Sequence, residues 1–216
     1  MSASPGHCEN PFFIVGAGRS GSTLLRMILS RHSLICIPPE SWFLLPLAQH
    51  FSFARQLEPS EIDSACRIIT THRRWQDFDL DAEVFSQHIA ERQADSVRAI
   101  CVVLFGLCMQ RAGKPRWGDK TPPYIAIVPE LLQLYPDARI IYLVRDGRDV
   151  TNSFIATRWH GPGVWANSRE WVSAARRFAA LAADSTIAGQ ILRVRYEDLV
   201  TDTESVTATV CAFLGI

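Results

Sequence analysis

The sequence has little lysine and no excess of charge of either sign. Its 216 residues include 22 basic and 22 acidic side chains, and Lys114 and Lys120 are the only lysines among the basic ones. A chain without net charge has no overall field that attracts nucleic acid or an anionic membrane surface. We therefore expect no nucleic-acid partner, and any anion that the protein binds must be recognised by a local site.

The sequence also lacks the patterns of a metal site, a secretory leader and a membrane span. Its six cysteines form no Cys-x-x-Cys pair and have no histidines at metal-ligand spacing, which favours buried free thiols over disulfides or a metal site. The N-terminus has neither the basic nor the apolar region of a signal peptide, and no apolar run reaches the roughly 20 residues of a transmembrane helix. We expect a cytoplasmic protein without a bound metal. The cysteines are Cys8, Cys36, Cys66, Cys101, Cys108 and Cys211.

Apolar runs and segments of helical periodicity alternate along the chain. With 48% hydrophobic residues, the chain is predicted to form one domain, residues 1–216, around one sizeable core. Strands that alternate with helices predict an α/β fold of three layers, with a mostly parallel central sheet and helices on both faces. Residues 60–112 are mostly helical in pattern, with Asp81 or Asp95 as an N-cap. The predicted strands are 12–15, 34–37, 139–144 and 191–194, and the other predicted helices are 23–29, 125–135, 149–158, 166–184 and 204–214.

A glycine-rich turn follows the first predicted strand and has two interpretations. The spacing Gly16-x-Gly18-x-x-Gly21 satisfies the dinucleotide-binding fingerprint, and Glu40 lies about 20 residues further on, where an acid would bind a ribose. The turn also carries an arginine and three hydroxyl residues around a helix N-terminus, which suit a tightly bound phosphate. It lacks the Gly-Lys-Ser/Thr ending of nucleotide triphosphatases. The residues that would hold the phosphate are Gly18, Arg19, Ser20, Gly21, Ser22 and Thr23.

A second candidate anion site follows the predicted strand 139–144. Arg145 lies at the carboxyl end of this strand, where open α/β sheets bind their ligands, and Ser153 lies about two turns into the next helix. An arginine fork and a hydroxyl can bind a second phosphate. The alternative is that Arg145, Asp146, Arg148 and Asp149 form a solvated ion-pair cluster that caps the helix, and we favour this role for Arg148 and Asp149.

The two motifs together resemble those of the sulfotransferases that use 3'-phosphoadenosine-5'-phosphosulfate (PAPS). The turn Arg-Ser-Gly-Ser-Thr is similar to the family's 5'-phosphosulfate loop, and Arg145 and Ser153 have the eight-residue spacing of its 3'-phosphate motif. The resemblance runs from about Phe12 to the chain end. It implies a fold like that of P-loop nucleotide triphosphatases, PAPS as donor, adenosine 3',5'-bisphosphate as product, and no metal.

Further residues would carry the chemistry if the resemblance holds. Arg19 and Glu40 have the spacing of the loop arginine and the glutamate base in the tyrosylprotein sulfotransferase branch, and we expect Glu40 to be the general base. Lys120 resembles a family lysine beside the sulfuryl group, and Tyr196 resembles a tyrosine near the nucleotide. The alternatives are that Glu40 caps the segment 41–49, that Lys120 is a surface lysine, and that Tyr196 only packs a strand-to-helix corner.

The chain ends earlier than is usual in this family. Members generally continue past the helix that ends in Phe-Leu-Gly, whereas this sequence stops at Ile216, and we expect a C-terminal segment of the domain to be missing. The acceptor would be a hydroxyl or an amine on a small molecule, a carbohydrate or a peptide. An NAD(P)-dependent oxidoreductase built on the same glycines, and a non-catalytic nucleotide-binding fragment, are the alternative functions.

Overall fold

The computed structural model describes residues 10–157 and 163–216. They divide into two compact units that are interleaved in the sequence. The first unit is built mainly from Ser33–Asp119 and Ile127–Ala138, and the second from Phe12–His32, Lys120–Ala126 and Arg139–Ile216. The second unit contains both candidate anion-binding motifs, which are the glycine-rich turn and the segment from Arg145 to Ser153.

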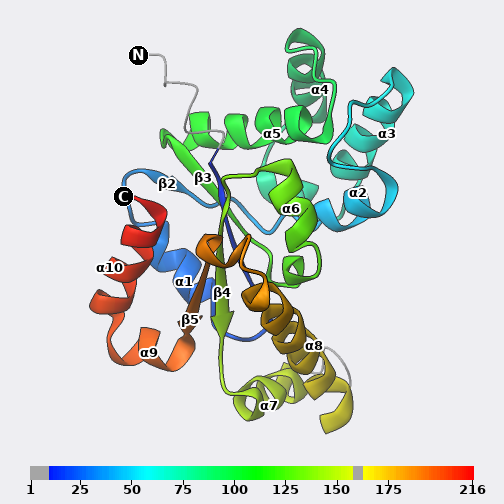
Figure 1. The fold of residues 1–216 in the computed structure, drawn as a ribbon. Coiled ribbons are helices and arrows are strands. Elements are labelled where there is room, and N and C mark those ends of the chain that lie inside the picture. The colour runs from blue at the N-terminus through cyan, green and yellow to red at the C-terminus, as the bar shows by residue number, and fades with distance from the viewer. Residues whose placement is uncertain (1–9, 158–162) are drawn as a thin grey trace. The chain divides into compact units, whose positions relative to one another are not determined.

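Three parallel strands form the framework of the second unit (Figure 1). Strand β4 (Arg139–Val144) pairs with β1 (Phe12–Gly16) on one side and with β5 (Ile191–Arg195) on the other. Strand β1 is buried at every position, as expected for the continuous apolar run of a parallel strand that is covered on both faces. In parallel strands the carboxyl ends meet at one edge, so the residues that follow β1, β4 and β5 lie at the same edge of this sheet.

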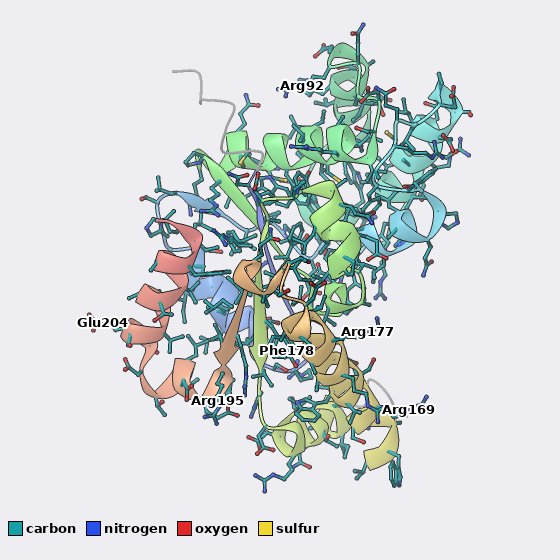
Figure 2. The ribbon with its side chains drawn as sticks, in the orientation of Figure 1. Arg92, Arg169, Arg177, Phe178, Arg195 and Glu204 are labelled. Atoms are coloured by element: carbon teal, nitrogen blue, oxygen red, sulfur yellow. The ribbon has the colours of Figure 1, made fainter. Side chains whose placement is uncertain are left out.

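Helices cover both faces of these strands. Tyr142 of β4 stacks on Phe178 at a centroid distance of 4.1 Å, and Phe178, labelled in Figure 2, belongs to α8 (Val164–Ala183). Arg139 lies three positions earlier on β4, hence on the opposite face, and its guanidinium lies 5.2 Å from the ring of Phe213 in α10 (Thr203–Leu214). The remaining helices of this unit are α1 (Ser22–Leu29), α7 (Gly147–Thr157) and α9 (Tyr196–Thr201), with the 3-10 turns η3 (Pro122–Ala126) and η4 (Ala188–Gln190).

The first unit is mainly helical. Its two short strands, β2 (Ile35–Cys36) and β3 (Arg116–Lys120), pair in parallel, and Lys120 at the end of β3 belongs to the second unit. Trp117 of β3 stacks on Phe105 at 3.8 Å and meets the edge of Tyr135 at 5.5 Å, which forms a buried aromatic core. The helices are α2 (Leu44–His50), α3 (Pro59–Thr70), α4 (Ala82–Glu91), α5 (Val97–Ala112) and α6 (Val128–Leu134), with the 3-10 turn η2 (Trp75–Phe78).

The predicted α/β class, with parallel strands and helices on both faces, is confirmed. Asp81 caps α4 as predicted, because its carboxylate accepts hydrogen bonds from two backbone N–H groups of the first turn. Asp95 is not a cap, since Ser96 caps α5. The helix predicted to begin at Ile125 begins at Val128, after a 3-10 turn. Strand β3 was not predicted.

Two expectations that were based on absent patterns concern the cysteines and the membrane. The five cysteines that the structure describes are free thiols, and Cys8 lies outside the described residues. Residue 158, the predicted end of the helix 149–158, also lies outside them. Within residues 10–157 and 163–216, every helix is too short or too polar to cross a lipid bilayer.

Candidate active site

The glycine-rich turn joins β1 to α1 in the second unit. Arg19 adopts the left-handed conformation, with φ of 64°, and Gly21, the N-cap residue, has φ of 92°. As the N-cap residue, Gly21 has no side chain that could cap α1. The backbone N–H groups of a helix N-terminus attract anions when no side chain satisfies them. The turn therefore offers an anion-binding geometry at the carboxyl end of β1.

Ser20 provides a buried hydroxyl in this turn. The residue is only 1% exposed, and its Oγ has no hydrogen-bond partner among the described residues. A buried hydroxyl without a partner is unfavourable by about 1–3 kcal/mol. A phosphate oxygen would satisfy it, so the donor set in the turn fits the predicted ligand.

The structure brings the loop arginine to the second motif. The Arg19 Nε donates a hydrogen bond to Oγ of Ser153 at 3.0 Å, although the two residues are separated by 134 positions in the sequence. Ser153 lies on α7, about two turns after β4, as the sequence predicted. The two candidate anion sites are therefore adjacent.

Arg145 follows β4 and lies against Tyr196, the first residue of α9. The Arg145 guanidinium lies 4.5 Å from the centre of the Tyr196 ring, and it forms an ion pair of 3.5 Å with Asp149. Its Nε is buried and has no hydrogen-bond partner in the described part of the chain. A cation over an aromatic face is stabilised by the ring quadrupole, so Tyr196 orients the Arg145 side chain.

Tyr196 also packs on the glycine-rich turn. A Cβ atom added to Gly21 would lie 2.2 Å from Cδ2 of the Tyr196 ring. Two constraints therefore require glycine at position 21: its φ is positive, and the tyrosine ring occupies the space that a side chain would fill. Tyr196 thus contacts both the glycine-rich turn and Arg145, rather than only a strand-to-helix corner.

Arg148 forms a solvated ion pair with Asp146, another member of the predicted ion-pair cluster. The Nη2 and Nε of Arg148 lie 2.6 and 3.0 Å from the two carboxylate oxygens of Asp146. The hydrogen bonds from the Arg148 side chain and backbone lower the pKa of Asp146 to about 2. The Arg148 side chain is 89% exposed, so this ion pair lies at the solvent. Arg145 is the arginine of the motif that contacts the Tyr196 ring.

Lys120, the last residue of β3, lies beside the glycine-rich turn. Its Nζ donates to Oγ1 of Thr23 at 3.4 Å. The residue is 4% exposed, so the alternative of an ordinary surface lysine is wrong. The structure thus places a second cation at the N-terminus of α1, together with Arg19.

Glu40 follows β2 and belongs to the first unit. Its Oε2 accepts a hydrogen bond of 2.7 Å from the Trp42 indole N–H and lies 3.6 Å from Nη2 of Arg74. Trp42 has φ of 55°, a left-handed conformation that costs about 1–3 kcal/mol in a bulky residue and is concentrated at functional sites. Glu40 is not the N-cap residue of the next helix, because α2 begins at Leu44 after Phe43.

Two further residues contact the predicted site but had not been predicted. The carboxylate of Glu170 accepts a hydrogen bond from the backbone N–H of Gly18, and the indole N–H of Trp171 donates to the carbonyl of Arg145. Both belong to α8, whose sequence is rich in alanine and also carries arginines and aromatic residues. No local sequence signal distinguishes them, because each contacts a backbone group of a distant segment.

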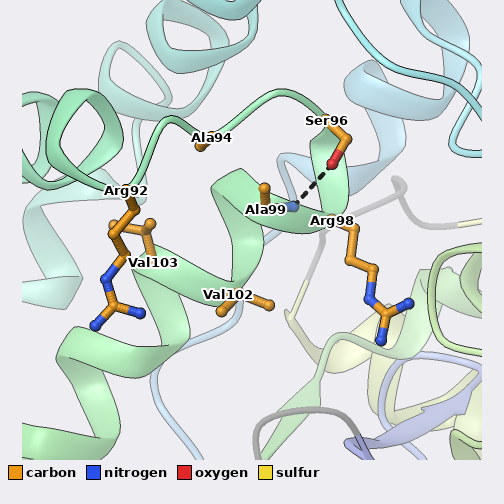
Figure 3. A pocket seen from close by; sticks show the side chains of 7 residues that line it. All are labelled: Arg92, Ala94, Ser96, Arg98, Ala99, Val102 and Val103. Atoms are coloured by element: carbon orange, nitrogen blue, oxygen red, sulfur yellow. Dashed lines mark hydrogen bonds between the residues drawn. The ribbon is translucent and has the colours of Figure 1, made fainter. Parts of the chain in front are cut away.

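A cavity of about 500 Å³ in the first unit is separate from these residues (Figure 3). It is lined by residues of α5 and of the turn before it, among them Arg92, Ser96 and Arg98. The Ser96 hydroxyl is already used, because it accepts the Ala99 N–H and caps the helix. None of the residues that the sequence singled out lines this cavity.

Comparison with curated proteins gives a nodulation protein as a relative. The chain is 30% identical to the nodulation protein NoeE of Sinorhizobium fredii over 153 residues, which are 70% of this chain and 32% of that protein. The chain thus spans about a third of the length of NoeE.

Solved structures agree over the whole chain. The sulfotransferase domain of the Synechococcus PCC 7002 olefin synthase is 28% identical, with a TM-score of 0.68 over 100% of this chain and 76% of that domain. The sulfotransferase domain of the curacin biosynthetic pathway is 23% identical and shares the fold, with a TM-score of 0.66 over 96% of this chain and 74% of that domain. Residues 11–216 match the model of the sulfotransferase family. The chain therefore belongs to the sulfotransferase family.

Proposed function

We propose that this chain transfers a sulfuryl group from PAPS to a hydroxyl or amine of its acceptor. The observation that carries the proposal is the hydrogen bond between Arg19 and Ser153, which joins two anion-binding motifs into one site. A ligand with phosphates at two separate positions fits such a pair better than a ligand with one. The family match supports sulfuryl transfer, and it disfavours the dinucleotide-dependent oxidoreductase that the glycine spacing also allowed.

In this proposal each of the two motifs binds one phosphate group of the donor. The backbone of Gly18 to Thr23 and the buried hydroxyl of Ser20 bind the 5'-phosphate, whose negative charge is favoured at the N-terminus of α1. Arg145 and Ser153 bind the 3'-phosphate. Tyr196, which contacts Gly21 and the Arg145 guanidinium, lies next to the nucleotide.

Arg19 and Lys120 stabilise the charge that develops during transfer. As the sulfur–oxygen bond to the 5'-phosphate breaks and the acceptor oxygen or nitrogen bonds to sulfur, negative charge accumulates on the leaving phosphate oxygen. Lys120 is nearly buried and Arg19 is held by Ser153, so both cations are oriented before the reaction. Preoriented charges stabilise a transition state without a reorganisation cost.

Glu40 is the proposed base that takes the acceptor proton. The proposal rests on the Arg19-to-Glu40 spacing in the sequence and on the hydrogen bond from Trp42, which fixes the orientation of the carboxylate. Glu40→Gln retains an acceptor for the indole N–H but cannot take a proton at neutral pH. We expect this variant to bind adenosine 3',5'-bisphosphate normally and to lose about 100-fold or more in turnover. Unchanged turnover would exclude Glu40 as the base.

A thermal-shift measurement tests the donor assignment. At 100 times its Kd, adenosine 3',5'-bisphosphate should stabilise the chain by about 2.7 kcal/mol, a rise in Tm of about 5–10 °C for a chain of this size. Arg145→Ala should weaken its binding by about 10–100-fold, because a charge-assisted hydrogen bond is lost. Stabilisation by NAD and not by the bisphosphate would favour the oxidoreductase.

The non-catalytic alternative requires a separate measurement. Incubation with ³⁵S-labelled PAPS and a panel of small-molecule, carbohydrate and peptide acceptors should give labelled product from at least one acceptor. Donor binding without transfer to any acceptor of the panel would favour a nucleotide-binding fragment.

A further inference from the structure

Two neighbouring residues of α8 contact the two phosphate-binding motifs. The backbone N–H of Gly18 donates to Oε1 of Glu170 at 2.8 Å, and the indole Nε1 of Trp171 donates to the carbonyl oxygen of Arg145 at 2.9 Å. Gly18 begins the predicted 5'-phosphate loop, and Arg145 begins the predicted 3'-phosphate motif. One turn of a single helix therefore holds the backbone of both segments.

Gly18 is held closely between two helices. A Cβ atom at this position would lie 2.9 Å from Oε1 of Glu170 and 2.9 Å from Cζ of Phe154 in α7. The residue after Gly18 is Arg19, whose side chain reaches Ser153, the neighbour of Phe154. The backbone position of Gly18 thus determines the point from which the Arg19 side chain extends toward Ser153.

Trp171 holds the second motif in a similar way. A Cβ atom added to Gly147 would lie 2.9 Å from Cδ2 of the Trp171 ring, so the indole packs against the backbone at the start of α7. The backbone N–H of Asp146 donates to Oε1 of Glu197 at 2.8 Å. The turn between β4 and α7 therefore accepts a hydrogen bond from α8 and donates one to α9.

We propose that Glu170 and Trp171 are positioning residues that set the distance between the two phosphate sites. The inference rests on the proposed function. A ligand gains from its second phosphate only if the second site is held at the span of the ligand, because otherwise the ordering of the loops offsets the gain. The pair therefore determines the preference for a nucleotide with both 3'- and 5'-phosphates over a nucleotide with a 5'-phosphate alone.

The chemistry of Glu170 makes this role testable by a conservative change. Its carboxylate accepts a hydrogen bond from a neutral N–H group. Glu170→Gln retains an oxygen acceptor and removes the charge, whereas Glu170→Ala removes the acceptor. Trp171→Phe retains most of the ring and removes the N–H donor. Ser173→Ala, at an exposed position of the same helix, is the matched control.

Calorimetric titration gives the Kd of adenosine 3',5'-bisphosphate and the Kd of adenosine 5'-monophosphate. The preference is the ratio of the Kd of the monophosphate to the Kd of the bisphosphate, so a lower ratio means a weaker preference for the bisphosphate. One net hydrogen bond corresponds to about a fivefold change in equilibrium constant. We expect Glu170→Ala and Trp171→Phe each to lower the ratio about fivefold, and Glu170→Gln and Ser173→Ala to retain the wild-type ratio. Thermal unfolding of each variant confirms that it is folded.

Two results would overturn the inference while the proposed function stands. If Glu170→Ala and Trp171→Phe weaken both nucleotides equally, the residues only support the fold. If Glu170→Gln lowers the ratio as much as Glu170→Ala, the charge matters and the hydrogen bond to Gly18 does not. A wild-type chain that binds neither nucleotide would contradict the proposed function itself, and the inference with it.

Discussion

Replacement of Gly21 by alanine tests the contact that joins the glycine-rich turn to Tyr196. The new Cβ would lie 2.2 and 2.6 Å from two carbons of the tyrosine ring, distances that no relaxed structure tolerates. The backbone φ of 92° adds a strain of about 1–2 kcal/mol for a residue with a side chain. The displaced ring adds about 1–3 kcal/mol. We expect a loss of about 2–5 kcal/mol in the free energy of unfolding.

Gly113 provides a matched control for the backbone strain. It has φ of 62° at the C-cap of α5, and no atom lies within 4 Å of a Cβ built there. Gly113→Ala should therefore cost only the conformational part, about 1–2 kcal/mol. In a Tyr196→Ala background, Gly21→Ala should cost the same smaller amount, because the ring that it displaces is gone.

Chemical denaturation of the four proteins in this double-mutant cycle gives the coupling between the two positions, and calorimetry gives the affinity for adenosine 3',5'-bisphosphate. We expect a coupling energy of about 1–3 kcal/mol between positions 21 and 196. Gly21→Ala should also weaken nucleotide binding at least tenfold, since the tyrosine that supports Arg145 is displaced, whereas Gly113→Ala should leave it unchanged. Additive losses, with no coupling, would show that the ring does not pack on Gly21.

Three further predictions concern charge and thiol chemistry. The pKa of Asp146 in the folded chain is about 2, below the ordinary 3.8, so its contribution to stability is present above pH 4 and is lost as the pH falls toward 2. The difference in Tm between wild type and Asp146→Asn should therefore shrink between pH 4 and pH 2. A constant difference would refute the ion pair with Arg148. Desolvation raises the pKa of the half-buried Cys66 and Cys108 thiols to about 11 and 12, so at pH 8 both should react with a disulfide reagent at least tenfold more slowly in the native than in the urea-unfolded chain. Equal rates would contradict this desolvation. Lys120→Ala should lower turnover at least tenfold while Lys120→Arg retains part of it, and an unchanged rate in the alanine variant would remove Lys120 from the chemistry.

Most of the fold could be predicted because its buried strands are continuous apolar runs. The residues of β1 and β4 are almost all apolar, and their pattern alone marks them as strands. Strand β3 has the sequence Arg-Trp-Gly-Asp-Lys and is nevertheless buried at every position. Two of its polar residues make tertiary contacts that no local pattern reveals: Arg116 donates to the carbonyl of Asn10, and Lys120 donates to the Thr23 hydroxyl. The strand is thus determined by its surroundings.

The site shows the same division. Arg19 and Ser153 could be singled out because charged and hydroxyl side chains near strand ends are the groups that bind anions, and Lys120 because it resembles a family lysine. The structure brings Arg19 to Ser153 and Lys120 to Thr23. Glu170 could not be found in this way. Its contact is a hydrogen bond to a backbone N–H that is 152 positions away, and such a partner leaves no trace in the residue types nearby.

The most direct test of the proposed function is the electron density of adenosine 3',5'-bisphosphate bound to crystals of this chain. The proposed function predicts that the 5'-phosphate lies within hydrogen-bond distance of the Ser20 hydroxyl and the backbone of the glycine-rich turn, with the 3'-phosphate on Arg145 and Ser153. A nucleotide whose 3'-phosphate contacts neither Arg145 nor Ser153, or one that occupies the cavity beside Arg92 and Arg98, would contradict it.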